Sequence, residues 1–232
     1  MHQPNYQVEY QYNGVPNLFE FYLFVNPLGS LCYQCEQEIS KVVKAISTST
    51  DVYILPYHNQ TTIKEFMERL SIPGNNLNQR NDFYCKVYHA CLAFKAASMQ
   101  GQRNGRRYLM SLQSHLMGKA SLYNRPLAIK LAKELNLDVE TFVQDLESDF
   151  VRKLYMRDQK IAKEMQISQT PTLIIRELQS NNIETLVKEE ITLHQILDQT
   201  DMMVADHIAS LKEKEHTPNQ RKTKLQILRN HR

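Results

Sequence analysis

Apolar positions near the start of the chain form a continuous run and then change to helical spacing. The run from Leu18 to Val25 predicts a buried β-strand. After a short loop, the spacing typical of one helix face follows, at Ile39, Val42, Val43 and Ile46. A second apolar run, Val52 to Leu55, is stopped by Pro56 and predicts a second strand. These segments together predict a βαβ unit with parallel strands and a right-handed connection.

From residue 61 to residue 149 the pattern is helical, and no strand candidate interrupts it. The periodicity predicts helices over residues 62–70, 83–100, 106–117, 126–135 and 139–146. Segments 73–76 and 101–105, rich in Gly, Pro and Asn, are expected to separate them, and Asp138 is a good N-cap for the last. A further helix, from about 149 to 165, would lead back to the sheet.

Strand patterns return in the last third of the chain. Thr172 to Ile175 and Ile183 to Lys188 are predicted strands, and Thr192 to Leu211 is the predicted closing helix. The first 17 residues, rich in Gln, Asn and Tyr, predict a tail or a short edge segment. The basic stretch from His216 to Arg232 predicts a solvated tail, with partner docking as the alternative.

Composition limits the class of protein. With 232 residues and 42% hydrophobic content, the chain can bury one substantial core. No apolar run approaches the roughly 20 residues that span a bilayer, and the polar opening lacks a signal peptide, so we expect a cytoplasmic protein without membrane contact. Four cysteines are too few for a disulfide scaffold. The net charge of +3 gives no reason to expect nucleic-acid binding.

Cys32 and Cys35 form a Cys-x-x-Cys motif between the first strand and the first helix. A helix N-terminus stabilises a thiolate, and the thiolate is the nucleophile, so the motif in this place indicates thioredoxin-like redox chemistry. Half of a zinc site has the same spacing. The second pair would have to come from Cys85, His89 and Cys91, whose positions do not share one helical face, so we expect no metal and no cofactor.

Thr170-Pro171 opens the third strand and supplies a second signal. A cis Thr-Pro bond would direct its carbonyl toward the cysteines, which makes both residues candidates for substrate binding. The two halves together resemble the thioredoxin superfamily, and the helical block between them resembles its DsbA-like branch. The predicted fold class is therefore α/β, a thioredoxin-like domain (18–58 plus 150–212) with a helical insertion (59–149) and tails at 1–17 and 213–232.

Three stretches resemble the YjbH/SpxH family of low-GC Gram-positive bacteria. They are Phe21 to Leu28, Ala90 to Gly101, and Ile161 to Met165 ahead of Thr170-Pro171-Thr172. The resemblance implies a cytosolic adaptor that binds an Spx-like transcription regulator and promotes its degradation by the ClpXP protease. It also implies an alternative, because relatives are described as DsbA-family dithiol–disulfide isomerases. In that case Cys32 and Cys35 would be the catalytic residues.

The adaptor and the oxidoreductase differ in how Cys32 and Cys35 align with the Cys-x-x-Cys motif of DsbA-like relatives. In DsbA-like relatives the strand commonly runs into Asp-Pro-Leu-Cys-x-x-Cys, so an alignment on Asn26-Pro27-Leu28 puts Gly29 at the attacking cysteine's position and Cys32 at the second. A longer loop would instead keep Cys32 as the nucleophile, and we expect Cys32 to alkylate before Cys35. Glu36 and Glu38 are interpreted as carboxylates that favour the helix dipole and need no catalytic role.

Overall fold

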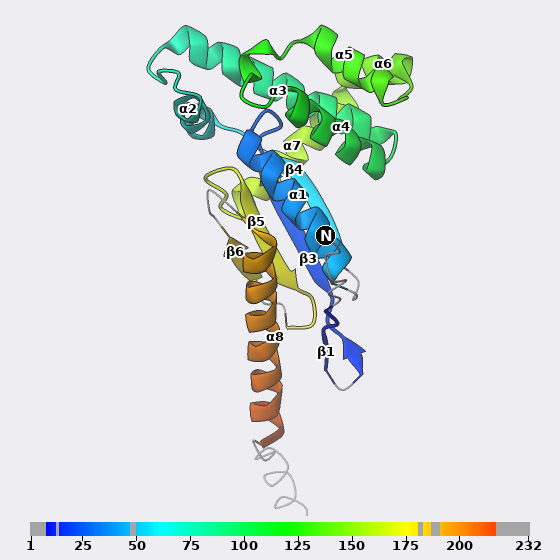
Figure 1. The fold of residues 1–232 in the computed structure, drawn as a ribbon, viewed down its shortest axis with the longest axis vertical. Helices are drawn as coiled ribbons and strands as arrows, with labels where there is room; N and C mark the ends of the chain where they lie inside the picture. The colour runs from blue at the N-terminus through cyan, green and yellow to red at the C-terminus, as the bar shows by residue number, and fades with distance from the viewer. Residues whose placement is uncertain (1–7, 13, 47–49, 181–182, 187–190, 217–232) are drawn as a thin grey trace, which may run out of the picture.

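A computed structural model describes residues 8–12, 14–46, 50–180, 183–186 and 191–216 (Figure 1). Its central sheet has the strand order β4-β3-β5-β6. The strands are β3 (Phe19–Val25), β4 (Thr50–Pro56), β5 (Thr172–Glu177) and β6 (Ile183–Leu186). β3 pairs parallel with β4 and antiparallel with β5, and β5 pairs antiparallel with β6. All four predicted strands are confirmed, although residues 187 and 188 of the last lie outside the described residues.

Alternating side chains of β3 cover the two faces of this sheet. Phe19, Phe21 and Leu23 are buried in one cluster with residues of α1 (Ser30–Ala45) and α8 (Leu193–His216). Phe24 belongs to a smaller cluster on the opposite face, with residues of α7 (Asp149–Glu164). Because side chains alternate along a strand, a strand covered on both faces has the nearly continuous apolar sequence seen here.

The block between β4 and α7 is helical, as predicted, and the structure describes all of its residues. Its elements are α2 (Gln60–Arg69), α3 (Leu77–Met99), α4 (Gln102–His115), the 3-10 turn η1 (Ala120–Leu122), α5 (Arg125–Glu134) and α6 (Val139–Glu147). Side-chain oxygens accept hydrogen bonds from backbone N–H groups of the first turn at five helix starts, at Asn59, Asn76, Asn124, Asp138 and Ser148. These caps stabilise the helix ends where the sequence changes from loop to helical spacing.

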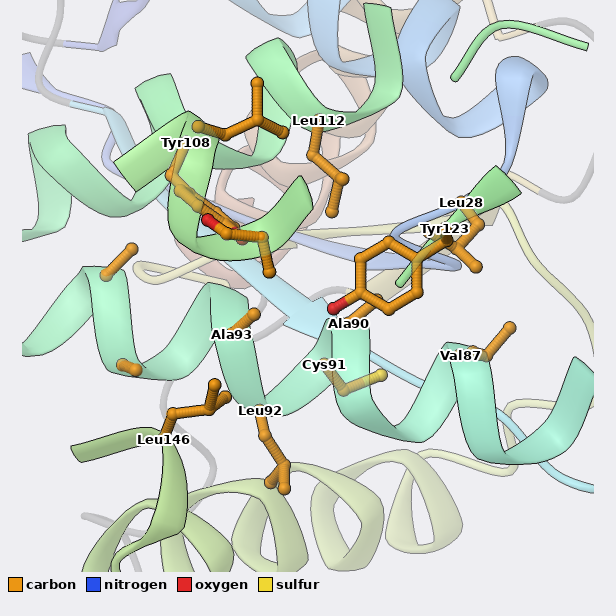
Figure 2. Close-up of a cluster of buried hydrophobic side chains, with 14 of the residues drawn as sticks. Leu28, Val87, Ala90, Cys91, Leu92, Ala93, Tyr108, Leu112, Tyr123 and Leu146 are labelled. Carbon is orange, nitrogen blue, oxygen red and sulfur yellow. The ribbon is translucent and has the colours of Figure 1, made fainter. Parts of the chain in front are cut away.

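α3 is the central helix of this block, with neighbours on several sides (Figure 2). Tyr108 and Leu112 of α4 and Tyr123 after η1 pack with it in one apolar cluster, and Leu146 of α6 lies on another side of α3 (Figure 2). Leu28, from the loop before α1, belongs to the same cluster. The helical block is therefore packed directly against the start of α1.

α4 begins at Gln102 and not at Arg106, which corrects the prediction that residues 101–105 are a break. Gly101, with φ of 116°, precedes the helix, but Gly105 lies inside it. A Cβ atom on Gly105 would stand 2.1 Å from the Ser98 hydroxyl oxygen, so the glycine permits α3 and α4 to approach closely. Sequence alone does not distinguish this packing role from a turn.

Regular secondary structure extends into both of the predicted terminal segments. β1 (Gln11–Tyr12) pairs antiparallel with β2 (Val15–Pro16). Tyr10 is only 5% exposed and donates a hydrogen bond to Asp201 of α8 at 2.7 Å. α8 continues to His216, beyond the predicted tail boundary at residue 213. The rest of the predicted basic tail lies outside the described residues. None of the helices in the described part of the chain is long and apolar enough to cross a membrane.

Candidate functional site

The loop from β3 into α1 brings a glycine to the start of the helix. The Asn26 side chain accepts a hydrogen bond from the Leu28 N–H at 2.9 Å, and the Asn26 carbonyl accepts one from the Gly29 N–H at 2.9 Å. Gly29 is the N-cap of α1, with an extended backbone. A Cβ atom on Gly29 would lie 3.3 Å from the Cys32 sulfur. Gly29 and Cys32 are therefore close enough for a side chain at 29 to contact that sulfur.

Cys32 lies in the first turn of α1 but is only 2% exposed. Its sulfur accepts a hydrogen bond from the Asn26 N–H at 3.2 Å. Burial raises the pKa of the Cys32 thiol, and the Asn26 hydrogen bond offsets only part of this effect. An attacking cysteine needs the opposite change, a lowered pKa, so the expected thiolate stabilisation of Cys32 is not found. Cys35, one turn further along, is 1% exposed.

The Thr170-Pro171 peptide bond is cis, as predicted, and leads directly into β5. Both residues are buried. The Thr170 carbonyl accepts a hydrogen bond from the Arg69 guanidinium at 3.0 Å. Arg69 is the last residue of α2, so the helical block contacts the cis-proline loop directly.

A pocket of about 250 Å³ lies between these elements. It is lined by Asn26, Gly29, Ser30, Leu31, Cys32, Phe66, Arg69, Leu70 and Thr170. Of the four predicted site residues, Cys32 and Thr170 line this pocket and Cys35 and Pro171 do not. Phe66 and Arg69 of α2 were not predicted, because nothing in the local pattern of α2 indicates that it reaches the cis-proline loop.

Glu36 has an environment that differs from the sequence interpretation. It is 3% exposed, in the second turn of α1, and its Oε1 accepts a hydrogen bond from Gln113 Nε2 at 2.8 Å. Burial raises the pKa of Glu36 to about 8. Glu36 Oε2 and Gln113 Oε1 are both buried without a hydrogen-bond partner. A proton on Glu36 would supply the donor that the Gln113 oxygen needs, so the neutral acid fits this site and a charged dipole partner does not.

Residues of the zinc alternative are separated in the structure. Cys85 is exposed, whereas the His89 ring nitrogen lies 2.7 Å from the Tyr123 hydroxyl oxygen. The Cys91 sulfur lies 3.8 Å from Nδ1 of the buried His58. Burial lowers the pKa of His58 to about 4, which keeps the ring neutral among aromatic neighbours. Among the described residues, no group of three or more His, Cys, Asp and Glu side chains could hold a metal ion.

Alkylation of the native protein is expected to begin at Cys85 on α3. Cys85 is exposed, whereas Cys32, Cys35 and Cys91 are buried, and a thiol must be accessible to react. A time course with iodoacetamide, followed by peptide mass spectrometry, measures the order of modification. Cys85→Ser should remove the first adduct. Modification of Cys32 at the rate of Cys85 would contradict the burial that the structure shows.

The comparisons with known proteins agree with this geometry. A family model described as Thioredoxin matches residues 22–198. The chain is 30% identical to the ClpXP adapter protein SpxH of Bacillus subtilis (strain 168), over 73% of this chain and 63% of that protein. It is 28% identical to the SpxH protein of Bacillus licheniformis, over 66% of this chain and 56% of that protein. The chain thus spans less than two thirds of the length of these curated relatives.

Solved structures with the same fold include two proteins of Pseudomonas aeruginosa. DsbA2 matches with a TM-score of 0.57 and 14% identity, over 80% of this chain and 88% of that chain. DsbA matches with a TM-score of 0.56 and 13% identity, over 90% of this chain and 95% of that chain. At these identities the likeness shows the fold alone. Fold, family model and sequence relatives together show that the chain belongs to the thioredoxin family, in the YjbH/SpxH branch.

Proposed function

We propose that this protein is a cytoplasmic adaptor that binds a protein client, an Spx-like transcription regulator, and promotes its degradation by the ClpXP protease. The names of the curated relatives support the protease and the adaptor role. The Spx-like client comes from the family resemblance. The pocket beside the cis-proline loop, with Thr170 and Pro171 in that loop, is the proposed client contact.

The residues at the N-terminus of α1, a glycine at the N-cap and a buried cysteine in the first turn, favour client binding over redox catalysis. Gly29, which has no side chain, stands at the N-cap, where a helix best stabilises a thiolate. The thiol nearest to it, Cys32, is 2% exposed and its pKa is raised by burial. A client can still contact the pocket, whose wall includes apolar and hydrogen-bonding groups. The proposal rests on this one observation, an accessible pocket whose cysteine is buried and stands beside a glycine at the helix N-cap.

A thiol–disulfide oxidoreductase is the second candidate. Cys32 lines the same pocket as Thr170, which is the relation that such chemistry needs. In this reading Cys32 attacks, Cys35 resolves, and Thr170 and Pro171 position the substrate backbone. The burial of both thiols opposes it.

The test compares the wild type with the Cys32→Ala/Cys35→Ala double variant. With purified ClpXP and an Spx-like client, we expect both proteins to accelerate client degradation equally, because binding does not need the thiols. Degradation is followed by gel densitometry, and circular dichroism checks that the variant is folded. If a folded double variant no longer bound the client, the adaptor would need its cysteines and the proposal would be wrong.

The same assay series includes Gly29→Cys as the reverse change. A Cβ atom at 29 lies 3.3 Å from the Cys32 sulfur, so the new thiol stands close enough to pair with Cys32. We expect the variant to reduce insulin disulfides with dithiothreitol as electron donor, and the wild type to remain at the uncatalysed rate. Efficient catalysis by the wild type, lost in Cys32→Ala, would instead support the oxidoreductase.

A further inference from the structure

β4 is the terminal strand of the sheet, and its outer edge faces the helical block. The Tyr57 N–H donates to the Val25 carbonyl at 2.9 Å, so odd-numbered residues here direct their backbone groups toward β3. In a strand the neighbouring residues direct theirs to the other side. The backbone groups of Val52, Ile54 and Pro56 therefore lie along the outer edge.

At each end of this outer edge a side chain forms hydrogen bonds with the outward backbone groups and so caps the edge. Gln159 of α7 donates to the Pro56 carbonyl at 2.8 Å and accepts from the His58 N–H at 3.5 Å, as the peptide group of a neighbouring strand would do. Arg106 of α4 donates to the Val52 carbonyl. Ile54 lies between these two caps. No strand in the described part of the chain pairs with its outward N–H and C=O groups.

A cavity of about 280 Å³ lies against the central part of this edge. Its wall includes Phe94 and Lys95 of α3, Arg106 of α4, and Arg157 and Asp158 of α7. Asp158 forms an ion pair with Lys95, whereas the Arg106 and Arg157 side chains are exposed. The charged groups on the wall therefore carry an excess of positive charge.

We propose that this edge is a docking site for an extended acidic segment of a protein partner. The segment adds as a short strand, its backbone pairing with the N–H and C=O groups of Ile54, and a carboxylate of the segment binds Arg106 or Arg157. Backbone pairing at an exposed sheet edge is a general mode of peptide recognition, and guanidinium groups are suited to carboxylates. The site shares no lining residue with the cis-proline pocket, so it does not depend on the function proposed for that pocket.

The experiment is an NMR titration of the ¹⁵N-labelled protein with the blocked peptide acetyl-Glu-Val-Thr-Val-Glu-amide. We expect the amide resonance of Ile54 to shift saturably. The same peptide with Lys in place of Glu, and the peptide with an N-methylated Thr, should each bind at least roughly tenfold more weakly, because one loses the carboxylates and the other a backbone donor. If the acidic peptide did not shift the Ile54 resonance, the proposal would be wrong. Gln159 and Arg106 would then serve only to protect an unpaired strand edge from aggregation.

Protein variants provide the matched control. Arg157→Glu and Arg106→Ala should each weaken binding of the acidic peptide roughly tenfold, since each removes one charged hydrogen-bond donor. Arg103→Ala changes an exposed arginine of α4 outside the cavity wall and should leave binding unchanged. An equal loss in Arg103→Ala would show general charge attraction and would overturn a specific site. Because the changed side chains are exposed, all three variants are expected to fold, which their NMR spectra check directly.

Discussion

Glu36→Gln is expected to stabilise the protein, by an amount that grows as the pH rises. Burial raises the pKa of Glu36 from 4.5 to about 8, so between these values the folded protein holds a proton that the unfolded chain releases. The contribution of Glu36 to the stability of the wild type is therefore fully present below pH 4.5. It is lost progressively as the pH rises from 4.5 to the folded-state pKa of about 8. Glutamine needs no proton. Near neutral pH the variant should be more stable by on the order of 3 kcal/mol.

Urea unfolding at a series of pH values measures this difference. The amide of the variant keeps an acceptor for Gln113 Nε2 and adds a donor for the unpartnered Gln113 oxygen, so the hydrogen bonding should be complete. Glu134→Gln, at an exposed position of α5, is the matched control and should show little change at any pH. A loss of stability in Glu36→Gln, or a gain independent of pH, would mean that Glu36 is charged in the folded protein.

Asp158→Ala is expected to destabilise the protein by about 3–5 kcal/mol. Asp158 of α7 pairs with Lys95 of α3, and their side chains are only 1% and 12% exposed. Removal of the carboxylate leaves the buried ammonium group of Lys95 without its counter-charge. An uncompensated buried charge is strongly destabilising. Chemical unfolding measures the loss.

Two further variants separate this effect from ordinary loss of contacts. The double variant Lys95→Met/Asp158→Leu removes both charges and should recover most of the stability. Asp82→Ala breaks a pair with Lys86 in which Asp82 is 57% exposed, and it should change stability by about 1 kcal/mol or less. If Asp158→Ala were as mild as Asp82→Ala, the pair would contribute no more than a surface contact.

Local patterns were sufficient to predict the four strands of the central sheet and the helical block between them. β3 is covered on both faces and so is nearly all apolar, and helices that pack on one side show the matching periodicity. The Thr-Pro pair before β5 identified the cis-proline loop. The pairing of β1 with β2 was not predicted, because this polar sequence resembles a loop and the burial of Tyr10 depends on its contacts with Phe19 of β3 and with α8. Gly105 was misinterpreted because a glycine at a helix crossing and a glycine in a turn look alike.

The candidate site was harder to predict because its properties come from contacts distant in sequence. The motif Cys32-x-x-Cys35 predicts a helix start but not that burial raises the pKa of Cys32. Arg69 reaches the Thr170 carbonyl from a position 101 residues earlier in the chain. Glu36 looks like an ordinary charged residue of a helix surface until Gln113 of α4 packs over it. In each case the tertiary packing determines the chemistry of the side chain.

The lack of a side chain at Gly29 has an evolutionary consequence. Glycine codons that end in a pyrimidine differ from the cysteine codons by a single base. Since a Cβ atom at this position would stand 3.3 Å from both the Cys32 sulfur and the Asn26 carbonyl oxygen, such a point mutation would bring two thiols together with only a small shift of these neighbours. On this scaffold the loss and the recovery of a dithiol pair are therefore separated by one mutational step.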